Sequence, residues 1–452
     1  MKNLSQWDKQ YVWHPFTPMQ LWLESEPLVI ERGEGVYLYD SDGNRYIDGI
    51  SSLWCNVHGH CHRHINAAIC DQLEKIAHST LLGLASQPSI ELAKRLVEIT
   101  PAGLTKVFYS DSGATAVEIA LKMAFQYWRN RGQKQRTKFI ALKQSYHGDT
   151  LGSVSVGGIR IFHEIFGPLT FEALFCASPH PYRFDGSADE CRETSLQQME
   201  NLLRQNENHI AAIVIEPLVQ GAAGMIVHPE GFLAGVAKLA REYDVLLIAD
   251  EVATAFGRTG TMFACEQEDV QPDLMCLAKG MTGGYLPAAA TLTTDRVFEA
   301  FLHEPWSKTT FYHGHTYTGN ALGCAAALAS LEVFEQEQTI ETLQPKIAMM
   351  ENALQSIAEL DYVGDVRQKG MMVGIELVEN KSTGENFDPA KRIGAKLCQH
   401  LRSMGVILRP LGDVIVLMPP LAIQEAQLTE LLRIVSDSIQ NDLANIRKIS
   451  MA

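Results

Sequence analysis

The chain lacks the features that mark secreted, membrane-spanning and disulfide-bonded proteins. Its nine cysteines form no CxxC pair, and thiols scattered in this way are typical of reduced core residues. No uncharged apolar stretch reaches the length of about 18 residues that a membrane-spanning helix needs. The first residues, MKNLSQWDKQ, lack the apolar core of a signal peptide. We therefore expect a cytoplasmic protein that does not enter a membrane.

Positive charge is also scarce. The 452 residues include 38 Lys and Arg against 53 Asp and Glu, which gives a formal net charge of −15. This balance disfavours contact with a phosphate backbone, so we expect no nucleic-acid partner. An anionic substrate would need a local group of cations that works against the overall field.

The middle of the chain contains short apolar runs separated by segments of helix length. The runs cover Lys106–Ser110, Lys138–Leu142, Ala211–Ile215, Val245–Ala249 and Leu274–Leu277. Continuous apolar runs of this length are typical of strands buried on both faces of a sheet. Their alternation with helices predicts the α/β class, with a mainly parallel sheet covered by helices on both faces.

The two ends of the chain show a different pattern. Near the N-terminus, strand signals at Val36–Tyr39 and Arg45–Ile47 flank the turn DSDGN, which predicts a hairpin, and a further signal covers Leu28–Ile30. Beyond about residue 330, a helix over Gln338–Ala358 and a closing helix from Ile423 enclose the short strand signals MMVGIELV, GVILRP and DVIVLMPP.

No low-complexity linker and no repeat of fixed period separates these parts. We predict a large domain of residues 61–330 and a smaller α+β domain built from residues 1–60 and 331–452.

Two of the predicted strands end in charged side chains. Asp250 follows the run Val245–Ala249, and Lys279 follows the run that begins at Leu274. Ligands of open α/β sheets bind at the carboxyl ends of the strands. An Asp and a Lys in such places most often form a solvated pair. A partly desolvated lysine is instead a Schiff-base nucleophile, because desolvation lowers its pKa and frees its lone pair.

A phosphate site is indicated where the run KVFYS passes through DSGA into a helix with an apolar stripe. A helix that begins at Ser112, Gly113 and Ala114 points unpaired backbone N–H groups and its positive dipole end at the edge of the sheet. An ordinary N-cap is the simpler alternative, because Ser and Asp are common caps.

One cofactor would explain these groups together. Pyridoxal 5′-phosphate needs a lysine for its Schiff base, a carboxylate that keeps the pyridine nitrogen protonated, and a phosphate site. Lys279, Asp250 and the helix start at Ser112 would supply them, and Tyr146 offers a ring to stack on the cofactor. We therefore predict pyridoxal 5′-phosphate as the cofactor.

A histidine-rich segment, SSLWCNVHGHCHRH, suggests a metal site. It contains His58, His60, His62 and His64 around Cys61, but this alternating spacing matches none of the usual zinc patterns. We predict no metal site, and a non-catalytic protein that binds metal through this segment stays as the alternative from another class.

Five ordered motifs resemble those of class III aminotransferases, in the fold-type I group of pyridoxal-phosphate enzymes. They are YHGDT from Tyr146, IEPLVQGAAGM from Ile215, ADEVATAFGRTG from Ala249, CLAKGMTGGYLP from Cys276 and GHTYTGN from Gly314. The resemblance covers nearly the whole chain. It implies a transaminase with a large cofactor-binding domain and a smaller α+β domain.

The resemblance also implies roles for single residues. Lys279 is the Schiff-base lysine and proton carrier, Asp250 contacts the pyridine nitrogen, and Tyr146 lies on the ring face. The phosphate is held by Gly113 and Ala114 of one subunit together with Thr316 of the other, so a homodimer with shared active sites is implied. We place Ser112, His147 and Glu216 with these cofactor-binding residues, while a supporting role for Arg258 stays open.

Within the class, WHPF, SSLWCNVHGH, YHGDT and GVILRPLGDVIVLMPP resemble the branch that converts 8-amino-7-oxononanoate to 7,8-diaminononanoate in biotin biosynthesis. That resemblance implies that Trp54 covers the aliphatic chain of the substrate and Arg409 binds its carboxylate. Asp149 receives the free amino group, with Tyr146 beside it, and Gly314 approaches by its backbone. Another class III ω-aminotransferase activity is the alternative.

Two positions depart from the commoner pattern of this branch. Phe16 stands after the His-Pro pair where a Tyr is usual, and His315 stands where many members have Pro. Both positions belong to the donor pocket and are counted with the substrate-binding residues. S-Adenosyl-L-methionine is the expected amino donor, and L-lysine is the alternative.

Overall fold

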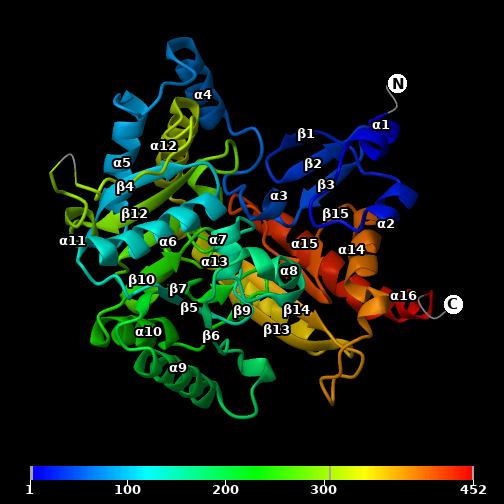
Figure 1. The fold of residues 1–452 in the computed structure, drawn as a ribbon. Helices are drawn as coiled ribbons and strands as arrows, with labels where there is room; N and C mark the ends of the chain where they lie inside the picture. The colour runs from blue at the N-terminus through cyan, green and yellow to red at the C-terminus, as the bar shows by residue number, and fades with distance from the viewer. Residues whose placement is uncertain (1–3, 305–306, 450–452) are drawn as a thin grey trace.

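The computed structural model describes residues 4–304 and 307–449, and a seven-stranded sheet forms the centre of its larger part (Figure 1). In spatial order the strands are β4 (Leu104–Ser110), β12 (Ala289–Thr294), β11 (Leu274–Leu277), β10 (Leu246–Asp250), β7 (Ile210–Ile215), β5 (Lys138–Leu142) and β6 (Leu174–Cys176). All are parallel except β12, which pairs antiparallel with both neighbours. The predicted α/β class and mainly parallel sheet are confirmed.

The sheet is buried on both faces because successive strand residues belong to different apolar layers. In β7 and β10, Ala212, Val214, Leu246 and Ile248 pack with helix α6 (Gly113–Asn130). The alternate residues Ile213, Ile215, Leu247 and Ala249 share a layer with residues of α9 (Ala188–Gln205) and α10 (Phe232–Glu242). This period of two explains why these strands read as continuous apolar runs.

The two ends of the chain meet in a second region. A four-stranded sheet has the order β1 (Ile30–Glu34), β2 (Tyr37–Asp40), β3 (Arg45–Asp48) and β15 (Val406–Ile407), and β15 runs parallel to β3. The predicted hairpin is present as β2 and β3. The first strand begins at the end of the predicted segment Leu28–Ile30 and continues beyond it. The division of the chain at residues 60 and 330 stays a prediction.

A further four-stranded sheet completes the C-terminal part. Its order is β13 (Val363–Lys369), β14 (Met372–Leu377), β17 (Val414–Leu417) and β16 (Arg409–Leu411), and a separate two-stranded ladder pairs β8 (Val219–Gln220) with β9 (Ile226–Val227). The predicted C-terminal helices correspond to α13 (Thr339–Ala358), α14 (Ile393–Ser403) and α15 (Glu425–Asp437).

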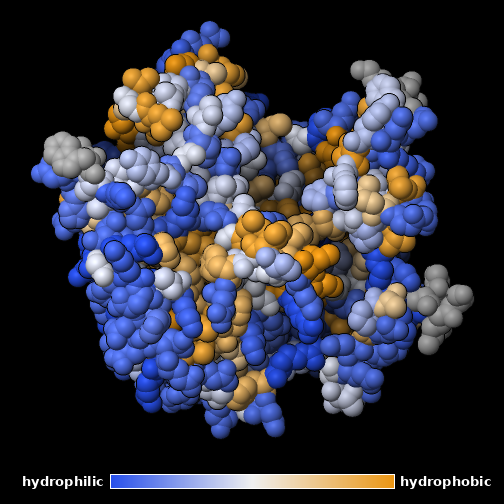
Figure 2. Space-filling view, viewed as in Figure 1, coloured by the Kyte–Doolittle hydropathy of each residue, from blue (hydrophilic) through white to orange (hydrophobic). Residues whose placement is uncertain are grey.

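The remaining α-helices surround these sheets. They are α1 (Leu4–Tyr11), α2 (Met19–Glu24), α3 (Ser51–Trp54), α4 (Arg63–Lys75), α5 (Gln87–Ile99), α7 (Leu151–Ser155), α8 (Arg160–His163), α11 (Asp295–Glu299), α12 (Ala321–Gln336) and α16 (Leu443–Ile449). Among the described residues, none of the helices combines the length and apolar character needed to span a bilayer. The surface is hollowed between the lobe with α4 and α12 and the lobe with β1 to β3 (Figure 2).

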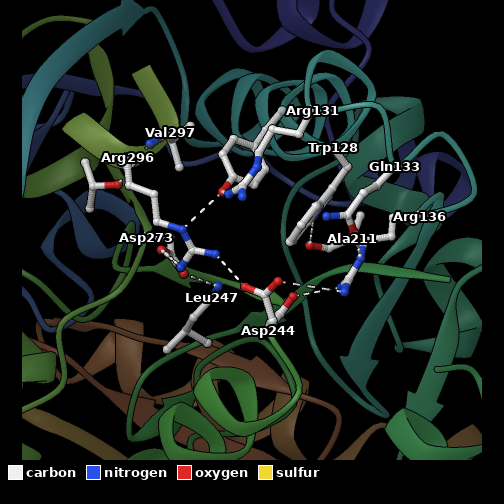
Figure 3. A network of polar contacts seen from close by, with 12 residues as sticks. Trp128, Arg131, Gln133, Arg136, Ala211, Asp244, Leu247, Asp273, Arg296 and Val297 are labelled. Atoms are coloured by element: carbon white, nitrogen blue, oxygen red, sulfur yellow. Dashed lines mark hydrogen bonds and ion pairs between the residues drawn. The ribbon is translucent and has the colours of Figure 1, made fainter. Parts of the chain in front are cut away.

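The amino ends of the central strands carry a connected network of charges (Figure 3). Arg136 donates to the backbone carbonyl of Asp244 at 2.7 Å and lies over the ring of Trp128, 4.1 Å from its centroid. The Asp244 carboxylate accepts from Arg296 at 2.7 Å, and Arg296 also donates to the Tyr127 hydroxyl at 3.1 Å. These contacts join the loops that precede β5 and β10 to helices α6 and α11.

Candidate active site

A cavity of about 620 Å³ lies at the carboxyl ends of the central strands. Its walls come from the segments that follow β4, β5, β7, β10 and β11, and from the α3 turn of the N-terminal part. This is the edge of the sheet where open α/β folds bind their ligands, and the volume lies within the range of small-molecule sites. Ten of the predicted site residues line it: Trp54, Ser112, Gly113, Ala114, Tyr146, His147, Asp149, Glu216, Asp250 and Lys279.

Lys279 begins the short turn after β11 and faces the cavity. Its backbone has a positive φ of 46°, so the chain turns sharply there. Burial lowers the pKa of its ammonium, and the carboxylates of Asp250 and Glu216 oppose this shift without cancelling it. The ammonium nitrogen lies 5.1 Å from the ring centroid of Trp54, a cation–π distance. The lysine is therefore held in a setting that favours its neutral, nucleophilic form.

Asp250 ends β10 and is paired with His147. The His147 Nδ1 donates to the Asp250 carboxylate at 2.7 Å, and the backbone N–H of Val252 donates to its other oxygen at 3.2 Å. Burial alone would lower the pKa of His147, but the hydrogen bond and charge of Asp250 outweigh it and the net shift is upward. The next carboxylate, Glu251, accepts instead from the backbone of Cys265 at 2.8 Å. Of the two adjacent acids, Asp250 alone lines the cavity.

Tyr146 and Asp149 form a second polar pair in the cavity wall. The Tyr146 hydroxyl donates to the Asp149 carboxylate at 2.6 Å. Burial, this hydrogen bond and the negative charge of Asp149 all raise the pKa of Tyr146, which keeps the phenol protonated. The ring of His163 lies nearly parallel to the Tyr146 ring, at an interplanar angle of 13° and a centroid distance of 6.4 Å.

Glu216 holds the backbone of the segment that carries Tyr146. Its carboxylate accepts from the backbone N–H of Tyr146 at 3.1 Å and from that of Gly221 at 3.0 Å. Burial raises the pKa of this carboxyl to about 7, with a further upward contribution from Asp250 and an opposing one from His147. Glu216 thus fixes two backbone segments of the cavity wall.

The helix start at the cavity is built as the sequence predicts. Ser112 is the N-cap of α6, and its hydroxyl and the Thr115 side chain form a reciprocal capping box. Gly113 and Ala114, the first two helical residues, leave backbone N–H groups without intrahelical partners. An added Cβ at Gly113 would lie 2.5 Å from Val252, so this part of the wall needs a glycine. The capping box satisfies Thr115 and leaves the first two N–H groups for an anion.

Five predicted site residues lie outside this cavity. Phe16 and Arg409 line a neighbouring groove, while Gly314, His315 and Thr316 line neither hollow. The side chain of His315 approaches Asp111 of the cavity rim, with 3.9 Å between Nε2 and Oδ1, and Thr316 is exposed.

The cavity also contains residues that the sequence did not single out. Cys55, Thr282 and Tyr285 contribute to its walls. Tyr285 lies in the segment GGYLP, and its position shortly after Lys279 could have indicated that it lies near the lysine.

Arg258 lies outside the cavity lining. It is fully buried and donates to the backbone carbonyls of Pro419 at 2.6 Å and Asn56 at 3.0 Å, and burial lowers the pKa of its guanidinium to about 10. Arg258 therefore ties the loop after β10 to the N- and C-terminal segments.

The histidine-rich segment is dispersed rather than gathered. The His58 imidazole contacts the Ser330 hydroxyl, while His60, His62 and His64 pair with Asp48, Glu337 and Glu332 respectively. Across residues 4–304 and 307–449, no group of three or more His, Cys, Asp or Glu side chains is arranged to hold a metal ion. Three of these contacts join the segment to α12 or its C-cap residue, and the contact of His60 joins it to β3.

Residues 21–439 match the family model described as aminotransferase class-III. The chain belongs to this family. Its sequence is 56% identical over 430 residues to the adenosylmethionine-8-amino-7-oxononanoate aminotransferase of Aquifex aeolicus, and the match covers 94% of this chain and 95% of the relative. The protein with the same description from Geobacter sulfurreducens is 52% identical, with 93% and 94% of the two chains covered.

Solved structures of the family have the same fold as this class III aminotransferase. The adenosylmethionine-8-amino-7-oxononanoate aminotransferase of Methanocaldococcus jannaschii superposes with a TM-score of 0.92 at 50% identity, covering 96% of this chain and 98% of that one. The omega transaminase of Pseudomonas jessenii in complex with PMP gives 0.94 at 31% identity, with 98% of each chain covered. The resemblance stated from the motifs is confirmed at the level of the family and its fold.

Proposed function

We propose that this class III aminotransferase converts 8-amino-7-oxononanoate to 7,8-diaminononanoate, a step of biotin biosynthesis, with pyridoxal 5′-phosphate as cofactor. The observation that carries the activity is the convergence of Lys279, Asp250 and the first turn of α6 on one cavity. Relatives at 47% to 56% identity over nearly the whole chain bear the name of this enzyme, which supports the substrate.

The residues present fit pyridoxal phosphate. The unpartnered N–H groups of Gly113 and Ala114 would hold the phosphate at the helix N-terminus. Asp250, oriented by His147, would hold the proton of the pyridine nitrogen, and Tyr146 would cover the ring. When bound, the cofactor supplies an aldehyde that reacts with amines and a ring that withdraws electrons from the reacting carbon.

Lys279 is the group that moves protons in this arrangement. Its lowered pKa allows the neutral amine to attack a carbonyl and to take a proton from the carbon that carries the amine. Glu216 and the Asp250–His147 pair hold the segment with Tyr146 and His147 against the ends of β7 and β10. Arg258 joins these loops to the segments that carry Trp54.

The substrate would lie along Trp54 with its amino group near Asp149. The indole is 7% exposed and lines the cavity, with its ring centroid 5.1 Å from the Lys279 nitrogen. The Asp149 carboxylate, joined to Tyr146, offers a second oxygen to an ammonium group. Arg409, in the adjoining groove, would bind the carboxylate at the far end.

A homodimer with shared active sites is part of the proposal. Thr316, which would complete the phosphate site of the partner subunit, is exposed, and the neighbouring Tyr312 and Tyr317 are 82% and 61% exposed. Large exposed apolar side chains also occur at Ile161 and Ile165, at 86% and 80%, where apolar residues gather over α8 (Figure 2). A second copy of the chain would cover such surfaces.

S-Adenosyl-L-methionine is the proposed amino donor, and L-lysine is the alternative. The names of the relatives support the first, whereas Phe16 and His315 depart from the usual residues of the adenosylmethionine pocket. Mixing the cofactor-loaded enzyme with each donor in separate single-turnover reactions decides between them. The true donor is the one whose deaminated product appears by mass spectrometry without any keto substrate present.

The substrate is tested by turnover. Purified enzyme given 8-amino-7-oxononanoate and a donor should form 7,8-diaminononanoate, detected by mass spectrometry. A second activity, on simple diamines or ω-amino acids, is suggested by the likeness to omega transaminases at TM-scores of 0.93 and 0.94. If diamines are consumed while 8-amino-7-oxononanoate is not, the biotin-pathway assignment is wrong. We also propose that the enzyme acts in the cytoplasm, which its nine free thiols support.

A further inference from the structure

A groove of about 990 Å³ lies beside the candidate active site and has one strongly basic wall. Arg392, Lys396 and Arg402 reach it from α14 and the residue before that helix, and Arg409 reaches it from β16. All three line the groove, Arg392 from the N-cap position of the helix and Lys396 and Arg402 from within it. We call these three residues the α14 basic stripe. The helix buries its other side, including Leu397, in the core.

The positive charge of the stripe is opposite in sign to the net charge of the chain. The chain has a net charge of −15, yet four cations meet in this groove. In the described part of the chain, the guanidinium groups of Arg392, Arg402 and Arg409 form no hydrogen bond or ion pair. The opposite wall has two acids, Glu24, which accepts from Gln20 at 2.6 Å, and Glu26, which pairs with Lys9 at 3.3 Å.

The cavity beside the groove has the opposite polarity. Asp149 and Asp250 present carboxylates there. The two hollows are linked by a chain of rings, because Phe16 of the groove packs edge-on against Phe162 at 5.2 Å, and Phe162 packs edge-on against Tyr146 of the cavity at 6.3 Å. The basic groove and the acidic cavity thus lie on either side of these packed rings.

We propose that the α14 basic stripe extends the carboxylate site of Arg409 and orients the substrate before it reacts. This inference rests on the proposed function, because 8-amino-7-oxononanoate carries an ammonium near its ketone and a carboxylate at the other end. The field between groove and cavity aligns that dipole with the carboxylate outward and the amine toward Asp149. The reversed orientation would bring the carboxylate beside Asp149 and Asp250 and is disfavoured by repulsion.

The test removes two charges from the stripe. In the enzyme loaded with cofactor, Arg392→Gln with Arg402→Gln should raise KM for 8-amino-7-oxononanoate roughly threefold to tenfold at low salt, with kcat and the donor half-reaction unchanged. The increase should shrink in about 0.5 M salt, where the screening length falls to a few ångströms. The matched control is Arg204→Gln with Arg433→Gln, two arginines whose side chains are each 63% exposed on α9 and α15.

A second measurement does not depend on turnover. Nonanoate, a carboxylate of similar length without the amine and ketone, should bind the wild-type enzyme in calorimetry and bind the stripe variant several-fold more weakly at low salt. No product from 8-amino-7-oxononanoate, together with this charge-dependent binding, would refute the proposed function and leave the groove as a carboxylate site. Absence of nonanoate binding, an equal loss in the control, or a loss independent of salt would overturn the inference.

Discussion

Charged residues occur at both ends of the central strands, but they are paired at the amino ends and partly unpaired at the carboxyl ends. At the amino ends, Arg136, Asp244 and Arg296 are joined to one another or to backbone carbonyls (Figure 3). At the carboxyl ends, Lys279 makes no hydrogen bond or ion pair with any described residue, and the buried Nε2 of His147 has no partner. Leaving buried polar groups unpaired costs stability, and in this cavity a bound ligand can supply the missing partners.

The amino ends of the sheet thus contribute to the stability of the fold, and the carboxyl ends hold the reactive groups. The amino-end network reduces the cost of each charge by pairing it, whereas the carboxyl-end cavity holds a lysine whose pKa is lowered by burial. Loss of a paired charge at the first end should therefore change the free energy of unfolding, and loss of Lys279 at the second should change the rate of transamination.

The largest effect is expected from Lys279→Ala. Without the amine there is no nucleophile and no proton carrier, so kcat should fall on the order of 10⁴-fold or more. The free energy of unfolding should stay the same or rise, because a partly desolvated ammonium is removed. Turnover assays and denaturant unfolding measure the two quantities. Borohydride labelling with peptide mapping should place the label on Lys279 in the wild type, and label that persists in the variant would contradict the assignment.

The opposite behaviour is expected of Arg136→Ala. Arg136 is 5% exposed and donates to the carbonyls of Asp244 and Ile210 as well as to the Gln133 side chain. Its loss leaves buried carbonyls unpaired and should lower the free energy of unfolding by about 4 kcal/mol. The kcat per folded molecule should not change. Arg204→Ala, on the exposed face of α9, is the control and should change stability by less than about 0.5 kcal/mol. A lower kcat per folded molecule in the Arg136 variant would contradict the separation of stability from activity between the two ends.

Glu216→Gln should change how stability depends on pH. Burial raises the pKa of Glu216 from 4.5 to about 7, so between these values the folded protein binds more protons than the unfolded chain. The contribution of this carboxyl to stability is fully present below pH 4.5 and is lost as the pH rises through 7. The variant stays neutral and should not show this loss, which amounts to about 3 kcal/mol. Unfolding curves of both proteins across this pH range test the sign, and parallel curves would contradict it.

The smallest effect is expected from Asp244→Asn. The carboxylate of Asp244 is 56% exposed, so its pair with Arg296 is partly solvated. Because the backbone carbonyl that Arg136 uses is kept, stability should fall by about 1 kcal/mol at low salt. The loss should shrink in high salt. A loss as large as that of Arg136→Ala would mean that the side chain, not the carbonyl, holds the network together.

Much of the central sheet was predictable from the chain. Runs that are buried on both faces are apolar throughout, and the predicted Lys138–Leu142 and Leu274–Leu277 agree with β5 and β11 to the residue. β12 was not predicted because its sequence, AATLTT, is rich in small and hydroxylated residues. It is buried as an antiparallel strand between β4 and β11, a placement that depends on its neighbours.

The site was predictable to a similar extent. Residues at strand ends, such as Asp250, Lys279 and Glu216, could be grouped because parallel strands end at one edge. The contacts of Arg258 with the carbonyls of Asn56 and Pro419 join segments far apart in the chain, and no local pattern indicates them. The basic groove was missed for the same reason, since it forms only where α14 packs beside the N-terminal segment.

The sequence by itself determined the strand pattern, the helix start at Ser112 and the choice of Lys279 and Asp250, because burial, capping and charge are local properties of residue types. Only the tertiary structure decided which charges are paired. Pairing depends on distances of a few ångströms between segments separated by many residues, and these are set by how the whole chain packs. That packing leaves Lys279 unpaired beside Trp54, turns Glu251 away from the cavity, and brings four cations together in an acidic protein.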